Sequence, residues 1–201
     1  TYHRIMERRG VTPNEAKTIV RTNPTVIAAL MVYKNEADAM ICGTVGKYAE
    51  HTKDIIDIIG LKPGVETAAA MNALVLPSGT YFFCDTQINA DPGIAQISEM
   101  TLLAAEEVKR FGIRPKVALL SHSNFGTSDC ESAQKMRAAY ADLRRRDPAL
   151  EIDGEMQAEV ALSEEIRRAI MPNSNLKGAA NLFIMPNIDA AHIAFSLLRS
   201  L

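Results

Sequence analysis

Hydroxyl, imidazole and amide side chains are concentrated in the stretch "SHSNFGT", residues 121–127. It follows the short apolar run "VALL", which predicts a buried strand, and a helix-like pattern comes after it. A loop that leads into a helix presents unpaired backbone N–H groups, and Gly126 would let an anion approach them closely. The hydroxyls of Ser121, Ser123 and Thr127 add further donors. This set favours a phosphate-bearing ligand, and a plain turn that caps the helix is the alternative.

Two further loops carry related groups, "GTVGKY" at 43–48 and "PNID" at 186–189. The first offers glycine and lysine to an anion, although its glycine spacing does not fit the P-loop consensus. Because ligands of α/β folds bind beyond the carboxyl ends of strands, we expect these loops to line one site. Together with Asn124, the amide residue of the loop 121–127, the further candidate ligand contacts are Thr44, Gly46, Lys47, Asn187, Asp189 and His192.

Other chemistries find less support. His122 lies between Ser121 and Ser123, but neighbours on an extended segment point in opposite directions, and a GxSxG motif is missing. Asp153 and Glu155 could act as an acid–base pair or could simply form a turn and a cap. The histidines show no metal-ligand spacing, so no metal site is expected. Cys130 lies near a predicted helix start, which favours a thiolate, although an ordinary thiol is the simpler interpretation.

The composition is that of an ordinary globular protein of 201 residues, with 47% apolar and 23% charged residues. A net charge of −2 provides no field that would recruit nucleic acid or an anionic membrane. No apolar run is long enough to predict a membrane span. Three widely spaced cysteines predict reduced thiols and a cytoplasmic protein. The chain begins without methionine and ends inside a helix-like pattern, which predicts a piece of a longer protein.

Strand-like and helix-like stretches alternate, which predicts an α/β fold whose sheet is mostly parallel after a first hairpin. A turn at Lys62–Gly64 predicts a domain boundary, with residues 1–60 before it and 61–201 after it. The expected strands are 37–43, 65–77, 80–86, 117–120, the start of 150–157, and 180–186.

Helix starts are predicted from capping residues and from proline in the first turn. Thr12 with Glu15, and Ser128 with Glu131, have the spacing of capping boxes. The other expected N-caps are Asn23, Asp91 and Ser163.

Six stretches together resemble the phosphate acetyl/butyryltransferase family: "RRGVTPNEAK", "ADAMICGTVGKYAEHTKDIIDIIGLKPGV", "NADPGIAQISEM", "KVALLSHSNFGTSDCESAQKMR", "IDGEMQAEVAL" and "NLFIMPNIDAAHIAFSLLR". The resemblance extends over essentially the whole chain. It is strongest to the phosphotransacetylase-like C-terminal domain of large bacterial NADP-dependent malic enzymes. True transferases usually carry a Ser-x-Ser-Thr-Lys-Gly-Ser-type loop in place of "SHSNFGT", and Phe-Pro-Asp-Leu in place of "MPNI".

The resemblance implies an isocitrate/isopropylmalate dehydrogenase-like fold, with two α/β subdomains and a cleft between them. Residues 1–60 would belong to the first subdomain and 61–201 to the second. It further implies a regulatory domain that binds acetyl-CoA and helps a malic enzyme to oligomerise, as a homodimer or a larger assembly. NADP and a divalent metal are expected only in the upstream malic-enzyme module, which converts malate to pyruvate by oxidative decarboxylation.

Departures from the family pattern bear on whether this chain transfers acetyl groups. Active members carry Arg, usually followed by Pro, where Lys53-Asp54 align, and a further Arg near Met6. Lysine lacks the bidentate fork of arginine, and Asp54 would repel an anion. The family's Ser-Arg pair and the Asp after it lie beyond Leu201. We therefore expect binding without turnover. An active phosphate acetyltransferase, which exchanges acetyl between acetyl-CoA and phosphate, and a purely structural dimerisation domain are the alternatives.

Overall fold

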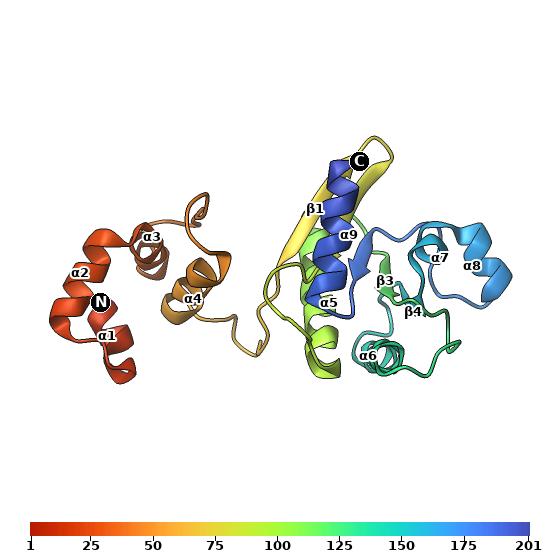
Figure 1. Ribbon diagram of the computed structural model, residues 1–201, viewed down its shortest axis with the longest axis horizontal. Coiled ribbons are helices and arrows are strands. Elements are labelled where there is room, and N and C mark those ends of the chain that lie inside the picture. The colour runs from red at the N-terminus through yellow and green to blue at the C-terminus, as the bar shows by residue number, and fades with distance from the viewer. The chain divides into compact units, whose positions relative to one another are not determined.

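The computed structural model describes residues 1–201. The chain divides into two compact units, Thr1–Val65 and Glu66–Leu201, and Figure 1 shows the elements of each. The boundary between the units, after Val65, lies directly beyond the turn at Lys62–Gly64. No helix is both long enough and apolar enough to cross a membrane.

The first unit is built from helices. Thr12 caps the second of them through the predicted capping box with Glu15, and Asn23 caps the next by accepting from Thr25 N and Val26 N. A small core that includes Met6, Val26 and Leu30 holds the helices together. The helices are α1 (Tyr2–Met6), the 3-10 turn η1 (Glu7–Arg9), α2 (Pro13–Thr22), α3 (Pro24–Tyr33) and α4 (Tyr48–Ile58).

The expected strand at 37–43 is wrong. These residues form irregular chain, and Ile41 is 98% exposed. A strand needs a neighbour that accepts its backbone hydrogen bonds, and the first unit contains no other strand. The apolar letters of "AMIC" therefore do not indicate burial here.

The second unit contains a five-stranded sheet in the order β1-β2-β5-β3-β4. The hairpin β1–β2 is antiparallel, and β2, β5, β3 and β4 pair in parallel, as the sequence predicts. The strands are β1 (Met71–Leu76), β2 (Gly79–Cys84), β3 (Val117–Leu120), β4 (Ile152–Met156) and β5 (Leu182–Ile184).

Helices cover both faces of this sheet and make it the middle of three layers (Figure 1). Successive side chains of a strand point to opposite faces, so Phe82 packs on one side with α5 and α6, while Phe83 packs on the other with α7 and α9. The helices are α5 (Ile94–Arg110), α6 (Glu131–Arg146), α7 (Ala158–Leu162), α8 (Glu164–Ile170) and α9 (Ile188–Ser200).

Two predicted caps of the second unit are wrong and one is confirmed. Gly93, not Asp91, is the N-cap of α5, because the side chain of Asp91 pairs with Lys135 instead. Cys130, not Ser128, is the N-cap of α6. Ser163 caps α8 by accepting from Ile166 N.

Candidate ligand-binding site

The carboxyl ends of the parallel strands meet at one edge of the sheet. The loop 121–127 follows β3, and the loop 186–189 follows β5, which pairs with β3. The segment after β2 begins with Asp85 at the same edge, since β2 also pairs with β5. The structure therefore brings two of the three predicted loops together, while 43–48 belongs to the first unit.

The donors of the loop 121–127 point inward, onto a buried carboxylate. Oε1 of Glu155 accepts from Ser123 Oγ at 2.9 Å, from Gly126 N at 2.9 Å and from Arg137 Nη1 at 2.8 Å. Glu155 is 0% exposed and Ser123 only 2%. Thr127 Oγ1 lies 3.1 Å from Ser123 Oγ and accepts from Asn124 N at 3.1 Å. Much of the loop's hydrogen-bonding capacity is thus satisfied within the protein.

The residue that follows β4 holds the same loop. Gln157 N donates to Asn124 Oδ1 at 2.8 Å, Asn124 Nδ2 donates back to Gln157 Oε1 at 2.6 Å, and Gln157 Nε2 donates to His122 O. His122 itself stays exposed beside Ser128, whose Oγ lies 3.2 Å from its Nε2. The carboxyl end of β4 therefore sets the shape of the loop that follows β3.

The interpretation of residues 153–155 as a turn with a cap is wrong, because all three lie inside β4. An acid–base pair is not formed either. Asp153 accepts from Ser174 Oγ at 2.6 Å and from Asn175 N at 2.9 Å, whereas Glu155 holds the loop 121–127. Each carboxylate binds its own neighbouring segment.

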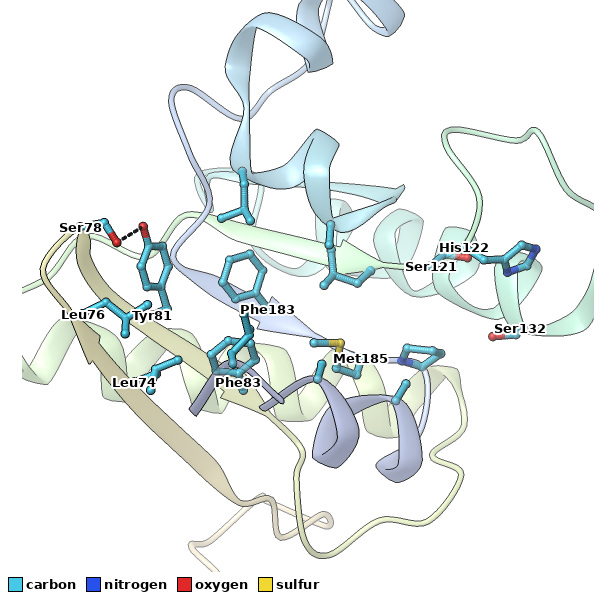
Figure 2. Close-up of a pocket in the computed structure, with 17 residues that line it drawn as sticks. Leu74, Leu76, Ser78, Tyr81, Phe83, Ser121, His122, Ser132, Phe183 and Met185 are labelled. Atoms are coloured by element: carbon cyan, nitrogen blue, oxygen red, sulfur yellow. Dashed lines mark hydrogen bonds between the residues drawn. The ribbon is translucent and has the colours of Figure 1, made fainter. Parts of the chain in front are cut away.

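An apolar groove of about 570 Å³ lies on the sheet face next to this loop. Figure 2 shows Ser78, Leu76 and Tyr81 at one end and His122 and Ser132 at the other. The remaining wall residues come from β1, β2, β3, β5, α7 and α9 and from the turns that follow the strands; they are Leu74, Phe83, Leu120, Ser121, Ala158, Leu162, Phe183, Met185, Pro186, Ala190, Ala194 and Leu198.

Among the predicted contact residues, Ser121 lines this groove. Asn187 caps α9 by accepting from Ala190 N at 2.9 Å, and Asp189 is exposed on the first turn of that helix. His192 faces the segment after β2, with Nδ1 3.3 Å from Thr86 O. These three residues lie at the same sheet edge but not on the groove wall.

The predicted loop 43–48 of the first unit is more exposed than the loop 121–127. Every residue from 41 to 50 is exposed, and Thr44 has a positive φ of 74°. His51 Nε2 contacts Val45 O at 2.8 Å, and its Nδ1 contacts Thr25 Oγ1 at 2.7 Å. Lys47 pairs with Glu50 at 3.6 Å.

The two positions where the resemblance expects arginine are occupied differently. Lys53 Nζ pairs with Asp57 Oδ2 at 2.7 Å, and this hydrogen bond raises the pKa of Lys53. Asp54 accepts from Asn23 Nδ2 at 2.8 Å. Met6 is buried in the core of the first unit. Neither position presents a guanidinium group.

Two cysteines of the second unit differ in their electrostatic environment. Backbone N–H of Ala133 and the hydroxyl of Ser128 lower the pKa of the exposed Cys130 thiol. Burial raises the pKa of Cys84 to about 12. The Cys130 Sγ also lies 3.7 Å from His122 Nε2.

The whole chain, residues 1–201, matches the family described as phosphate acetyl/butaryl transferase. The chain belongs to this family. Among curated relatives, it is 56% identical to the NADP-dependent malic enzyme of Escherichia coli and 47% identical to the NAD-dependent malic enzyme of Rhizobium meliloti. It is aligned over 98% and 100% of its length and covers 26% of each enzyme. The chain is thus about a quarter as long as these relatives.

Members named as transferases are more distant. The chain is 29% identical to the phosphate acetyltransferase of Acetivibrio thermocellus and covers 62% of it. Among solved structures, a phosphotransacetylase from Streptococcus pyogenes superposes with a TM-score of 0.91 at 27% identity, over 99% of this chain and 60% of that one. The EutD phosphotransacetylase from Staphylococcus aureus gives 0.86 at 26% identity, over 99% and 62%. The mixed α/β fold is therefore that of phosphotransacetylases.

Sequence reasoning did not predict which residues shape the loop after β3, although it singled out Glu155 as a possible acid or base. Glu155, Gln157 and Arg137 support this loop but come from β4, the segment after it and α6. The available signal was the predicted strand "IDGEM", in which two acidic residues stand between the apolar Ile152 and Met156. A charge retained within a buried strand needs a partner, and this identifies Glu155 as a structural anchor.

Proposed function

We propose that this chain is an acetyl-CoA-binding regulatory domain of an NADP-dependent malic enzyme, and that it binds the coenzyme without transferring its acetyl group. The proposal is supported by membership of the phosphate acetyl/butaryl transferase family together with the much higher identity to malic enzymes than to transferases. The observation that carries the absence of turnover is the pair of positions Lys53 and Met6, which hold no arginine.

The groove provides a physical reason for coenzyme binding. A cavity of about 570 Å³ lies within the range of small-molecule sites, and a mostly apolar wall with a few polar groups is typical of them. The pantetheine arm of a coenzyme A ester is long and carries methyl and methylene groups between its polar groups, so these apolar parts suit the wall formed by Phe83, Phe183 and Leu198. The thioester would then lie near Ser121 and His122.

The missing guanidinium groups argue against acyl transfer to phosphate. Transfer requires stabilisation of charge on the phosphate and on the acyl oxygen in the transition state. Lys53 is held by Asp57, which is also paired with Arg9, and Met6 is apolar and buried. A lysine offers a point charge and no bidentate fork, so these positions do not reproduce the arginine clamp.

Regulation requires that acetyl-CoA bind one state of the parent enzyme better than another. A coupling free energy of about 1–3 kcal/mol corresponds to roughly 5- to 150-fold in affinity. In this proposal the parent protein is a cytoplasmic homodimer or larger homo-oligomer, whose NADP and divalent metal are bound by its malic-enzyme module.

The test uses the full-length protein that contains this chain. Malate-dependent reduction of NADP is measured with increasing acetyl-CoA, and saturable inhibition is the expected result. Free coenzyme A is the matched control, because it lacks only the acetyl group. Malate oxidation that does not respond to millimolar acetyl-CoA would contradict the regulatory role.

An active phosphate acetyltransferase is the second candidate, favoured by the TM-score of 0.91 to a solved phosphotransacetylase. Formation of acetyl phosphate from acetyl-CoA and phosphate by the full-length protein distinguishes the two. Turnover of tens per second, an ordinary value for enzymes, would establish the transferase and reject binding without turnover.

A further inference from the structure

Glu155 connects three segments of the second unit through one oxygen. Its Oε1 accepts from Ser123 and Gly126 of the loop after β3 and from Arg137 of α6. Its backbone oxygen also accepts from Phe125 N at 2.8 Å. The side chain is completely buried, and Oε2 has no hydrogen-bond partner. This is an unusually demanding place for a carboxylate, since a buried charge is tolerated only when it is well paired.

The contacts of Glu155 fall on the part of the loop whose backbone is strained. Phe125 has a φ of 46° and Gly126 a φ of 96°, so two consecutive residues adopt the left-handed region. A non-glycine residue persists there only when its surroundings hold it. Phe125 N and Gly126 N, which fix this conformation, both donate to Glu155.

We propose that Glu155 is a positioning residue for the coenzyme: its carboxylate fixes the loop 121–127 in the conformation that binds acetyl-CoA. This inference rests on the proposed function, because it names the group that prepares the site for its ligand. A loop that is already ordered loses less conformational freedom on binding, so the ligand binds more tightly.

The chain contains a matched carboxylate for comparison. Glu151 directly precedes β4, at the opposite end from Glu155, and is also buried. Its Oε1 accepts from Lys177 N at 2.9 Å and its Oε2 pairs with Arg114 at 3.0 Å. Glu151 therefore shares the burial, the backbone donor and the arginine partner, but it does not contact the loop 121–127.

The experiment compares E155Q with E151Q in the full-length protein. Acetyl-CoA affinity is measured by calorimetry, and loop order by hydrogen exchange of peptides that cover 121–127. Glutamine keeps the shape and one acceptor oxygen but removes the buried negative charge that pairs with Arg137 at 2.8 Å, so that Arg137 keeps only the exposed Asp129 as a charged partner, at 3.6 Å. We expect E155Q to raise Kd about tenfold and to accelerate exchange of the loop, while E151Q changes Kd less than about twofold. If E155Q fails to fold, R137Q tests the same link, with an expected rise in Kd of about fivefold.

The outcomes separate the positioning role from the proposed function. Wild-type protein that binds acetyl-CoA, with E155Q binding equally well, overturns the positioning role and leaves the function intact. A weakened Kd without faster loop exchange also overturns it, because the effect would not pass through the loop. Wild-type protein that binds no acetyl-CoA overturns the proposed function, and the positioning role with it.

Discussion

Two of the three loops that sequence predicts as ligand contacts differ in how they are held. The loop 121–127 is hydrogen-bonded to the buried Glu155, and Ser123 is almost completely buried. The loop 43–48 is exposed throughout and is tied to its unit through the imidazole of His51. Both loops contain glycine and hydroxyl-bearing residues, so their compositions are similar. The difference lies in a buried partner elsewhere in the chain rather than in loop composition.

The largest expected effect is that of Glu155→Ala. It removes the shared carboxylate acceptor of Arg137, Ser123 and Gly126, so that Arg137 keeps only Ser128 O and Asp129, and Ser123 keeps only Thr127 Oγ1. Breaking a buried ion pair from one side costs about 3 kcal/mol or more, so the free energy of unfolding of the second unit should fall by about that amount in urea titrations. Glu159→Ala, an exposed carboxylate on α7, is the control and should change it by less than about 0.5 kcal/mol. Similar losses of unfolding free energy in both variants would contradict the role of Glu155 as the buried support of the loop 121–127.

Gly46→Ala should cost more than Gly126→Ala, although both glycines have positive φ. A Cβ at Gly46 would lie 2.9 Å from His51 Nε2, whereas nothing lies within 4 Å of a Cβ at Gly126. Left-handed strain costs about 1 kcal/mol in each case, and displacement of His51 adds about 1 kcal/mol at Gly46. Urea unfolding, monitored in each unit by hydrogen exchange, measures the difference between the two losses of unfolding free energy. Equal costs would show that the imidazole does not hold its loop.

His51→Ala tests directly whether the imidazole attaches the loop 43–48 to the first unit. It removes contacts of the imidazole with Val45 O and Thr25 Oγ1. The expected loss is about 1 kcal/mol, because an intramolecular hydrogen bond has a modest net value. Amide exchange should accelerate at 43–48 and stay unchanged at 121–127. Faster exchange at both loops would mean that they are not independent.

The smallest expected effect is a difference in thiol reactivity beside the two loops. Cys130 and Cys42 are both exposed, but the Ala133 N–H and the Ser128 hydroxyl lower the pKa of Cys130. A lower pKa increases the thiolate fraction at neutral pH, so iodoacetamide should label Cys130 several-fold faster at pH 7. The advantage should shrink as pH rises past about 8.5, where ordinary thiols ionise. Cys84, whose pKa is raised to about 12 by burial, serves as the unreactive control. Equal rates at Cys42 and Cys130 would contradict the lowered pKa.

The sequence predicts the strands of the second unit well because short apolar runs bounded by turn residues are local signals. Capping residues are a weaker signal: Ser163 in the second unit and the capping box at Thr12 in the first are confirmed, whereas Asp91 and Ser128 are not N-caps. The strand at 37–43 fails because strand formation depends on a neighbour that the local letters do not reveal.

The candidate site is harder to predict for the same reason. Sequence identifies the loop at 121–127, but the direction of its donors depends on Glu155, which is distant in sequence. A loop rich in donors can either present them to a ligand or direct them to the protein's own carboxylate. Only the fold shows that Ser123 and Gly126 do the latter, and that the groove opens beside Ser121 and His122.

Hydrogen exchange of the full-length protein, with and without saturating acetyl-CoA, tests the central claim most directly. If the loop after β3 and the groove beside it bind the coenzyme, peptides that cover 121–127 and the strand ends around Met185 should gain protection. Unchanged exchange at these peptides, or protection confined to other parts of the protein, would contradict the assignment of this edge of the sheet as the coenzyme site.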